Sequence, residues 1–298
     1  LEAAYGLARL AKAQIPGADP EQWFGILDLS TEEALVALEG EDAKQVYIAP
    51  SQLDDFLKCP LHWFMRHHGG RDSTFEASFG TLLHKVLEET KADDSDTLWQ
   101  GVMSKWHTLE FEASWLEQKE LRKAEAMVKR LSKYLIDQTN NGYELIGSEV
   151  DFEFDLGQAH IKGTVDRIER NAEGKVVIVD LKTGAKPKQE KVDEHPQLGL
   201  YQLAFEAGAF ADITQPGDVL EGARLLFVGS SVPVMDQAPI TDEETVHNSE
   251  FFKNIVAEAV RDMSMESKVF IAKVGTHCHA DRYGACPIHL VPGVSYVE

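Results

Sequence analysis

The sequence predicts a mixed α/β fold, with a mixed central β-sheet flanked by helices and a helical N-terminal half. Apolar residues follow helical spacing up to about residue 137. Alternating or continuous apolar runs, typical of strands, then follow between residues 149 and 180, and after them the two patterns alternate. Such an order is typical of one sheet with helices packed against it.

Residues 1–48 are expected to be a linker or lead-in from a preceding domain, and residues 49–298 the main domain. The first segment holds helical stretches such as residues 31–38, but also the turn-rich IPGADP and the acidic EGEDAK, which are typical of a linker. The chain begins with Leu rather than Met. We therefore expect a piece of a longer polypeptide.

Helices fill the first half of the main domain. Ser51, followed by Asp54 and an apolar-periodic run, predicts a capped helix start, and Pro60 is expected to kink or restart that helix. Residues 78–90 form a further helix. Residues 109–137 are rich in Ala, Leu, Lys and Glu, which predicts a long covering helix with one solvated face.

The middle of the chain predicts strands. Residues 149–155 alternate polar and apolar side chains, as a half-buried strand does. Residues 159–170 and 175–180 are two further strands, joined at Asn171–Gly174 by a hairpin turn, and VVIV in the second is typical of a buried central strand. The remaining expected elements are a helix over 195–209, a strand over 224–228 and a helix over 250–265.

Composition places the chain among globular proteins of the cytoplasm. No apolar run is long enough for a membrane span, no secretory leader is recognisable, and three cysteines do not make a disulfide framework. The net charge of −21, from 29 Lys and Arg against 50 Asp and Glu, by itself disfavours nucleic-acid binding. A bound cation and basic neighbouring domains would offset that charge.

Two aspartates and a lysine form the main candidate site. Asp166 and Asp180 end the two strands of the hairpin, and Lys182 shares a face with Asp180 because side chains alternate along a strand. Two close carboxylates repel each other and favour a divalent cation such as Mg²⁺. Lys182 can orient or deprotonate an attacking water, or stabilise charge on a phosphate. We expect Asp180 at an exposed strand end; the plain alternative is a strand entering a turn.

Other residues extend this candidate site. His84 lies four residues after Gly80 on an expected helix, and Glu149 begins the preceding strand. Gln197 and Tyr201 share one face of the helix that follows the lysine.

The motifs GTLLH, GSEVDFEF, GTVDRIE, VVIVDLKTG and QLGLYQLA together resemble the RecB-type nucleases of the PD-(D/E)XK superfamily. APSQLDDFLKCPLHWFMRHHGG also resembles the start of the C-terminal nuclease domain of bacterial, particularly actinobacterial, helicase–nucleases; the resemblance covers about residues 48–290. It implies an Mg²⁺- or Mn²⁺-dependent deoxyribonuclease, an exonuclease that processes double-strand ends for DNA repair and recombination. The implied partners are DNA, a helicase domain of the same polypeptide and a second helicase–nuclease subunit, with no membrane.

The resemblance also implies roles for individual residues. The metal is held by His84, Asp166, Asp180 and the carbonyl of Leu181, and Lys182 is catalytic. The supporting site residues are Glu149, as a further metal ligand, Gln197 and Tyr201.

The cysteines resemble a partly altered metal site. Relatives of this family often hold an iron–sulfur cluster with one early cysteine and a late group, which Cys59, Cys278 and Cys286 match in part. Asp281 stands where the middle ligand is expected, and the final spacing is one residue shorter. A [4Fe–4S] cluster, Zn²⁺ held with His277 or His279, and a degenerate site with buried thiols all stay open, and we expect the site to be empty or degenerate.

Two other functions are compatible with the sequence. One is a non-cleaving DNA-binding or scaffolding module that keeps the nuclease fold, which the negative charge favours and the complete set of catalytic residues opposes. The other is a free-standing restriction or repair nuclease, which the linker-like start opposes.

Overall fold

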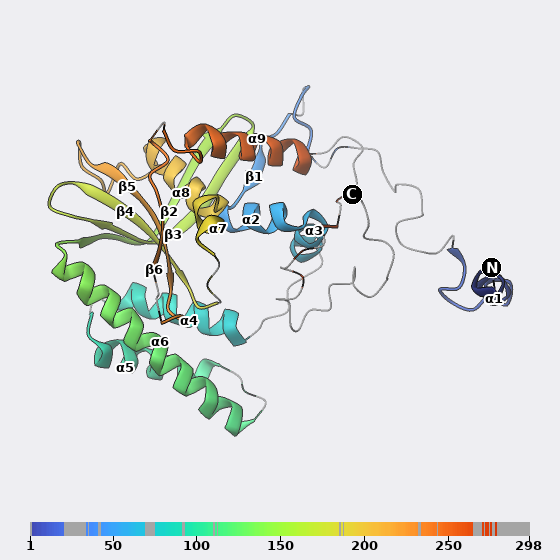
Figure 1. Ribbon diagram of the computed structural model, residues 1–298, viewed down its shortest axis with the longest axis horizontal. Coiled ribbons are helices and arrows are strands. Elements are labelled where there is room, and N and C mark those ends of the chain that lie inside the picture. Colours follow the sequence, from blue (N-terminus) through green and yellow to red (C-terminus); the bar gives the residue numbers. More distant parts are fainter. Residues whose placement is uncertain are drawn as a thin grey trace.

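A computed structural model gives the architecture of the chain (Figure 1). It describes residues 2–20, 34, 36–40, 43–68, 75–90, 93–109, 111, 113–184, 186, 188–231, 234–242, 244–264, 270, 272–273, 275 and 278. Within these residues, no helix is both long enough and apolar enough to cross a membrane.

Six strands of the described chain form one mixed sheet. They are β1 (Val46–Ile48), β2 (Glu144–Leu156), β3 (Ala159–Arg170), β4 (Lys175–Lys182), β5 (Val219–Phe227) and β6 (Val234–Gln237). The order is β1-β3-β4-β5-β6, and β2 pairs with β3 along nearly its whole length. The pairs β1·β3 and β4·β5 are parallel, whereas β2·β3, β3·β4 and β5·β6 are antiparallel.

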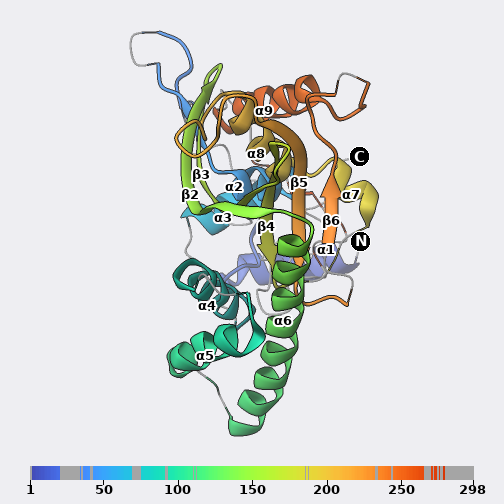
Figure 2. The same cartoon turned by 90° about the vertical axis from the view of Figure 1, so that its left-hand side faces the viewer.

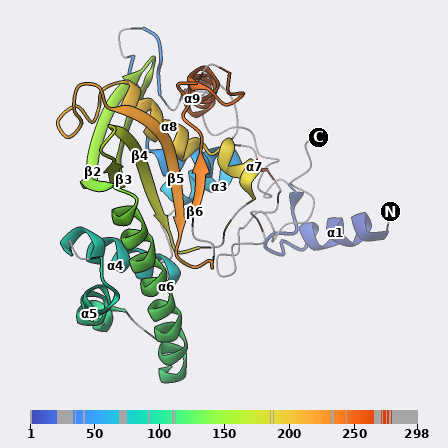
Figure 3. The ribbon, with the colours of Figure 1, turned by 60° about the vertical axis from the view of Figure 1, so that its left-hand side comes forward.

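Helices cover both faces of this sheet. The helices of the described part of the chain are α1 (Glu2–Lys12), α2 (Pro50–Lys58), α3 (Pro60–His68), α4 (Phe75–Glu89), α5 (Ser95–Lys105), the short 3-10 turn η2 (Trp106–Thr108), α6 (Ser114–Asn140), α7 (Gln189–Asp193), α8 (Pro196–Glu206) and α9 (Ser249–Ser264), of which α1 is drawn away from the sheet in Figure 1. Figures 2 and 3 show α4, α5 and α6 gathered on one side of the sheet and α8 and α9 on the other.

Strand β4 separates two apolar cores. Ile178 packs with side chains of α2, α8 and α9, whereas Val177, Val179 and Leu181 pack with those of α4, α5 and α6. Because successive side chains of a strand point to opposite faces, a continuous apolar run is what a strand buried on both faces needs. The predicted mixed sheet with flanking helices and a helical N-terminal part is confirmed.

Most expected elements exist, with shifted ends. The structure adds α5, α7, β1 and β6, whose short or weakly periodic sequences carry little signal. Strand β1 comes from the end of the expected lead-in and pairs with β3, so the sheet already begins at Val46. Within the expected helix over 31–38, the described residues 34 and 36–38 are not helical.

The start of α2 differs from the expected capping box. Ala49 is the N-cap, no side chain caps the helix, and Pro50 occupies its first turn. Ser51 therefore lies inside the helix. The fixed φ of proline and its missing N–H suit the first helical position, so Pro50 starts the helix without a hydroxyl cap.

Candidate active site

The candidate site lies where β3 and β4 separate. The two strands pair only from Arg167 opposite Val179 to Arg170 opposite Val176. Beyond this point β4 continues along β5, whereas β3 runs on towards β1. We call the place where the two strands diverge the β3–β4 fork. Asp166 and Asp180 are the first residues past the last pair, so both lie at this fork. There the backbone N–H of Leu181 donates to Asp166 Oδ2 at 2.6 Å.

Glu149 reaches the same point from β2. The pairs Ser148 with Arg167 and Val150 with Val165 flank it, which places Glu149 opposite Asp166. Its backbone has a φ of 49°, in the left-handed region that residues other than glycine rarely adopt. Strain of this kind is often found at functional sites.

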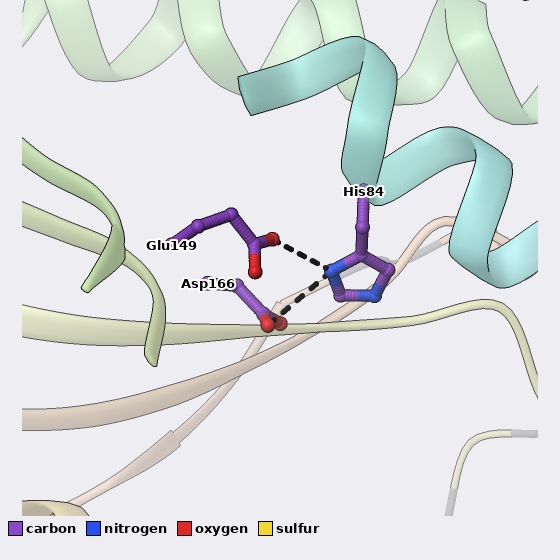
Figure 4. A group of neighbouring side chains, drawn as sticks. All are labelled: His84, Glu149 and Asp166. Atoms are coloured by element: carbon purple, nitrogen blue, oxygen red, sulfur yellow. Dashed lines mark hydrogen bonds and ion pairs between the residues drawn. The ribbon is translucent and has the colours of Figure 1, made fainter. Parts of the chain in front are cut away.

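Helix α4 brings His84 over the fork (Figure 4). Its Nδ1 lies 3.2 Å from Asp166 Oδ1 and 3.4 Å from Glu149 Oε1. Gly80, one turn earlier, allows this approach, because a Cβ there would stand only 3.3 Å from Oγ1 of Thr183, just past β4. The glycine of the GTLLH motif thus has a packing reason.

A second group of side chains surrounds Asp180 on the α8 side of the sheet. Lys182 Nζ lies 2.8 Å from Asp180 Oδ2 and donates to Gln197 Oε1 at 3.0 Å. Gln197 Nε2 donates to Asp180 Oδ1 at 2.7 Å, and the Tyr201 hydroxyl donates to the same oxygen at 3.2 Å. The expected proximity of these four residues is therefore present in the structure.

Asp180 is not at an exposed strand end, contrary to expectation. It is only 2 % exposed, because β4 is an interior strand and α8 packs directly over its end. Its neighbour Lys182 is half-buried. The sequence showed the residue at the end of its strand but not the helix that covers it.

Burial and charge shift the protonation of the site. Burial lowers the pKa of His84, but the hydrogen bond to Asp166 and the charges of Asp166, Glu149 and Asp180 together raise it to about 9. Burial and then the charge of Asp166 raise the pKa of Glu149. The pKa of Asp180 is also raised, first by burial, with Lys182 opposing. The unfavourable negative charge is thus offset in part by a protonated imidazole.

The donor atoms suit a divalent cation. Nδ1 of His84 and one carboxylate oxygen each of Glu149 and Asp166 lie within 4.8 Å of one another. Carboxylate oxygens with one imidazole are compatible with Mg²⁺ or Mn²⁺. A cation would replace the charge that the His84 proton now supplies, so the residues present fit the implied metal.

The sequence did not point to a pair of buried glutamines behind the site. Gln237 on β6 donates through Nε2 to the carbonyls of Val192, Asp193 and His195, at 2.8–3.2 Å. Gln202 on α8 donates to Gln237 Oε1 at 2.9 Å. These bonds hold the segment between α7 and α8, and so the start of the helix that carries Gln197. Isolated glutamines within segments of mixed polar and apolar residues give no sequence signal of such a role.

The predicted cysteine site is only partly described. Cys59 is buried and its Sγ accepts from the Lys273 N–H at 3.4 Å, while the Cys278 thiol lies 3.9 Å from the Lys273 carbonyl. Both cysteines thus contact the same residue. Asp281, Cys286, His277 and His279 lie outside the described residues.

The fold and the site together define an α/β protein with a cation-compatible acidic site at a split in its sheet. The chain belongs to the PD-(D/E)XK nuclease superfamily, whose family model matches residues 47–289. The match includes every residue of the fork and both helices that cover it.

Solved structures give more distant likenesses. A "Putative exonuclease" from Eubacterium rectale is 13% identical, with a TM-score of 0.48, and the match covers 90% of this chain and all of that one. The protein SSO0001 is 15% identical, with a TM-score of 0.31, over 74% of this chain and 77% of that one. No curated protein sequence matches the chain significantly.

Proposed function

We propose that this nuclease-family chain is a metal-dependent deoxyribonuclease, an exonuclease that hydrolyses phosphodiester bonds in DNA. The observation that carries the proposal is the convergence of Asp166, Asp180 and Lys182 at the β3–β4 fork with His84 and Glu149 above it. Four different elements supply these side chains. A strand that merely enters a turn would not require these five side chains to lie close together.

We assign the cation to His84, Glu149, Asp166, Asp180 and the carbonyl of Leu181, and its identity to Mg²⁺ or Mn²⁺. When bound, the cation polarises the phosphoryl group and lowers the pKa of water. The protein's own residues hold this arrangement in place. The Leu181 N–H fixes one Asp166 oxygen, and Gln197 with Tyr201 fixes one Asp180 oxygen.

Lys182 has the electrostatic role in this proposal. Burial lowers its pKa, but the neighbouring charge and hydrogen bond of Asp180 more than compensate, so the pKa is raised and the ammonium is retained at neutral pH. Gln197 and Asp180 together set the position of Nζ. A fixed cation stabilises the negative charge that develops on the phosphate and orients the water, whereas it is a poor general base.

The cellular setting is proposed from the sequence resemblance. The chain would act as the nuclease domain of a cytoplasmic helicase–nuclease that processes double-strand ends for recombination and repair. A helicase domain of the same polypeptide and a second subunit would deliver the DNA. Basic surfaces on those partners would offset the net charge of −21.

The first test incubates the purified chain with labelled linear DNA in Mg²⁺, in Mn²⁺ or in EDTA. We expect cleavage with either metal and none in EDTA. Folded protein that binds DNA but never cuts it, with either metal, would instead support the non-cleaving module.

Asp180→Asn should abolish cleavage while the fold survives. Asparagine keeps the shape and the acceptor oxygen for Gln197 and Tyr201, but it is a far weaker cation ligand. Asp180→Ala should lose cleavage too, and because Asp180 is buried it should also lower the melting temperature. Wild-type cleavage by the asparagine variant would contradict the assignment of Asp180.

Lys182→Ala should separate binding from chemistry. The lysine is not a ligand, so calorimetric metal affinity should persist while turnover falls by about 100-fold or more. Exposed Lys162→Ala is the matched control, which should leave both quantities unchanged. Loss of metal binding in Lys182→Ala would show that its role is wrongly assigned.

A further inference from the structure

Helix α6 concentrates basic side chains on one face of a protein whose net charge is −21. Its exposed residues recur at intervals of three, four or seven positions, which align side chains along one face of a helix. We call these residues the α6 stripe: Trp115, Lys119, Arg122, Lys129 and Lys133. Lys123 and Arg130 flank it. The opposite face, with Val128, Leu131 and Leu135, is buried in the core.

The stripe begins with an exposed aromatic ring. The Trp115 side chain is 68 % exposed and stands four residues before Lys119. A single exposed apolar residue needs no explanation. An indole in line with a row of cations is different, because aromatic rings stack on nucleic-acid bases while lysine and arginine contact the phosphates.

The carboxylates of α6 leave much of this charge available. Glu125 pairs with Lys129 and the buried Glu120 pairs with the flanking Lys123, each at 2.7 Å. Glu117, which accepts from the Trp106 indole at 3.2 Å, and Asp137, beyond the end of the stripe, add two further negative charges. Lys119, Arg122 and Lys133 form no ion pair with any residue the structure describes within 4 Å. Exposed ion pairs are weak, so a phosphate can replace Glu125 at little cost.

The stripe leads towards the candidate active site. Arg130 Nη1 donates to the carbonyl of Val228 at 2.6 Å, and the Val228 N–H donates to the Lys182 carbonyl at 3.1 Å. The middle of α6 is therefore joined to the end of β4 through two hydrogen bonds. From Trp115 to Arg130 the helix rises about 22 Å at 1.5 Å per residue. Figure 1 shows that its N-terminal part projects beyond the sheet.

We propose that the α6 stripe binds single-stranded DNA and guides it towards the β3–β4 fork. This inference rests on the proposed function, since it names the form and the path of the substrate. The cations neutralise successive phosphates, and Trp115 stacks on a base at the far end of the path. The surface of an anionic protein attracts a polyanion only where cations gather, and α6 carries such a gathering.

Charge reversal tests the cationic part of the stripe. Fluorescence anisotropy of a labelled 20-nucleotide single strand is measured in EDTA, where no cleavage occurs, over a range of salt concentrations. Lys119→Glu/Arg122→Glu/Lys133→Glu should weaken binding at least tenfold at low salt. It should also reduce the slope of log affinity against log salt by about 2, because each single-strand phosphate contact contributes about 0.7.

A matched triple variant controls for net charge. Lys44→Glu/Lys162→Glu/Arg261→Glu changes the net charge by the same amount, but these residues lie before β1, on β3 and on α9. It should weaken binding much less and keep the salt slope. Equal weakening by the two triples, or no weakening by the stripe triple, would overturn the proposal.

Trp115→Ala tests the aromatic part. The ring is exposed, so its removal should not unfold the helix, which circular dichroism checks. We expect about tenfold weaker binding of the single strand, as for one lost stacking contact, and an unchanged affinity for a blunt duplex. An equal effect on both DNA forms would overturn the proposal, because Trp115 would then not distinguish a single strand from a duplex. Competition by polyglutamate as effective as that by DNA would assign the stripe to another partner and would also overturn the proposal.

A small-substrate assay distinguishes failure of the DNA-binding inference from failure of the proposed nuclease function. Hydrolysis of bis(p-nitrophenyl) phosphate by the wild-type chain with Mn²⁺ tests the chemistry on a substrate too small to span the stripe. Hydrolysis combined with stripe-independent DNA binding would overturn only the inference. Stripe-dependent binding without any hydrolysis would support the inference and overturn the proposed nuclease activity.

Discussion

Glu149 combines an unusual backbone conformation with a place in the candidate metal site. Its φ of 49° in a strand is a conformation that costs about 1–3 kcal/mol for residues other than glycine. In this conformation the Glu149 carboxylate lies beside His84, and the residue lies opposite Asp166 on β3. Stability and cation binding therefore make opposite demands on this position.

Glu149→Gly should raise stability while it lowers metal affinity. Glycine adopts a positive φ freely, so we expect a gain of about 1 kcal/mol in the free energy of unfolding. Urea denaturation and Mn²⁺ titration measure the two quantities. Glu149→Gln is the matched control, because it removes the charge but keeps the side chain that disfavours this φ. Equal stability changes in the two variants would show that the conformation is not strained.

His84 should make metal binding pH-dependent. With a pKa raised to about 9, its imidazole is protonated at neutral pH in the metal-free protein, and a cation binds only the neutral ring. Metal binding should therefore release about one proton at pH 7.5, and affinity should rise by about tenfold per pH unit up to about pH 9. Below that pH, protons compete with the cation; above it, they no longer do.

Calorimetry in buffers of different ionisation enthalpy counts this proton. The variant His84→Asn should bind the metal more weakly and release none. Metal binding by the wild-type chain that is independent of pH between 7 and 9 would contradict the role of His84 as a ligand.

At the scale of elements, the position of α8 depends on β6. Gln237 is 2 % exposed and is bonded to three carbonyls of the segment that precedes α8. Gln202, fully buried on α8, completes the connection. Because Gln197 lies in the first turn of α8, these buried bonds indirectly set the geometry of Asp180 and Lys182.

Gln237→Leu should destabilise the protein and displace the start of α8. Leaving buried carbonyls without donors costs roughly 1–3 kcal/mol each, so we expect a loss of about 2–4 kcal/mol after relaxation. Turnover should fall while metal affinity changes little, because Gln237 touches no proposed ligand. The exposed Gln189, which bonds Asp193 and the Asp236 carbonyl, offers the control Gln189→Ala, with a loss under about 1 kcal/mol. Equal losses in both variants would contradict this account.

At the scale of the whole molecule, the region of α2 and α3 contacts a segment that lies more than 200 residues later in the sequence. Cys59 and Lys273 are 214 residues apart in sequence and in contact in space. Phe270 stacks on Phe64 of α3, with ring centroids 4.7 Å apart. A cluster or metal there would close a very long loop, and such a link can add several kcal/mol of stability.

We predict that this cysteine site is empty or degenerate. The sequence has three cysteines, whereas clusters are usually held by four thiolates. Cys59→Ser should then cost about 1 kcal/mol, as for an ordinary small buried residue. Iron, sulfide and zinc analysis of anaerobically purified protein measures the occupancy. Near-stoichiometric iron with an absorption band at roughly 400 nm, as expected for the clusters of such sites, would refute the prediction.

The sequence alone predicted the fold class and the order of the motifs. Periodicity is a local property, so β3, β4 and α8 could be recognised from the residues within them. Asp166 and Asp180 were candidates because each ends a predicted strand, with Lys182 on the same face as Asp180, and the resemblance of the motifs to a nuclease family supplied their roles. Segments without such local signals, such as the short strands β1 and β6, were missed, since their pairing partners and not their own residues define them.

Only the tertiary structure decided how the candidate residues face one another. The separation of β3 from β4, the left-handed φ of Glu149 and the burial of Asp180 each depend on contacts between segments far apart in sequence. The same holds for Gln237 and for the link from Arg130 to the end of β4. A residue type and its spacing specify which chemistry a side chain can perform. The packing of distant elements determines its charge state, its orientation and its partners, because these depend on burial and on groups that local sequence does not contain.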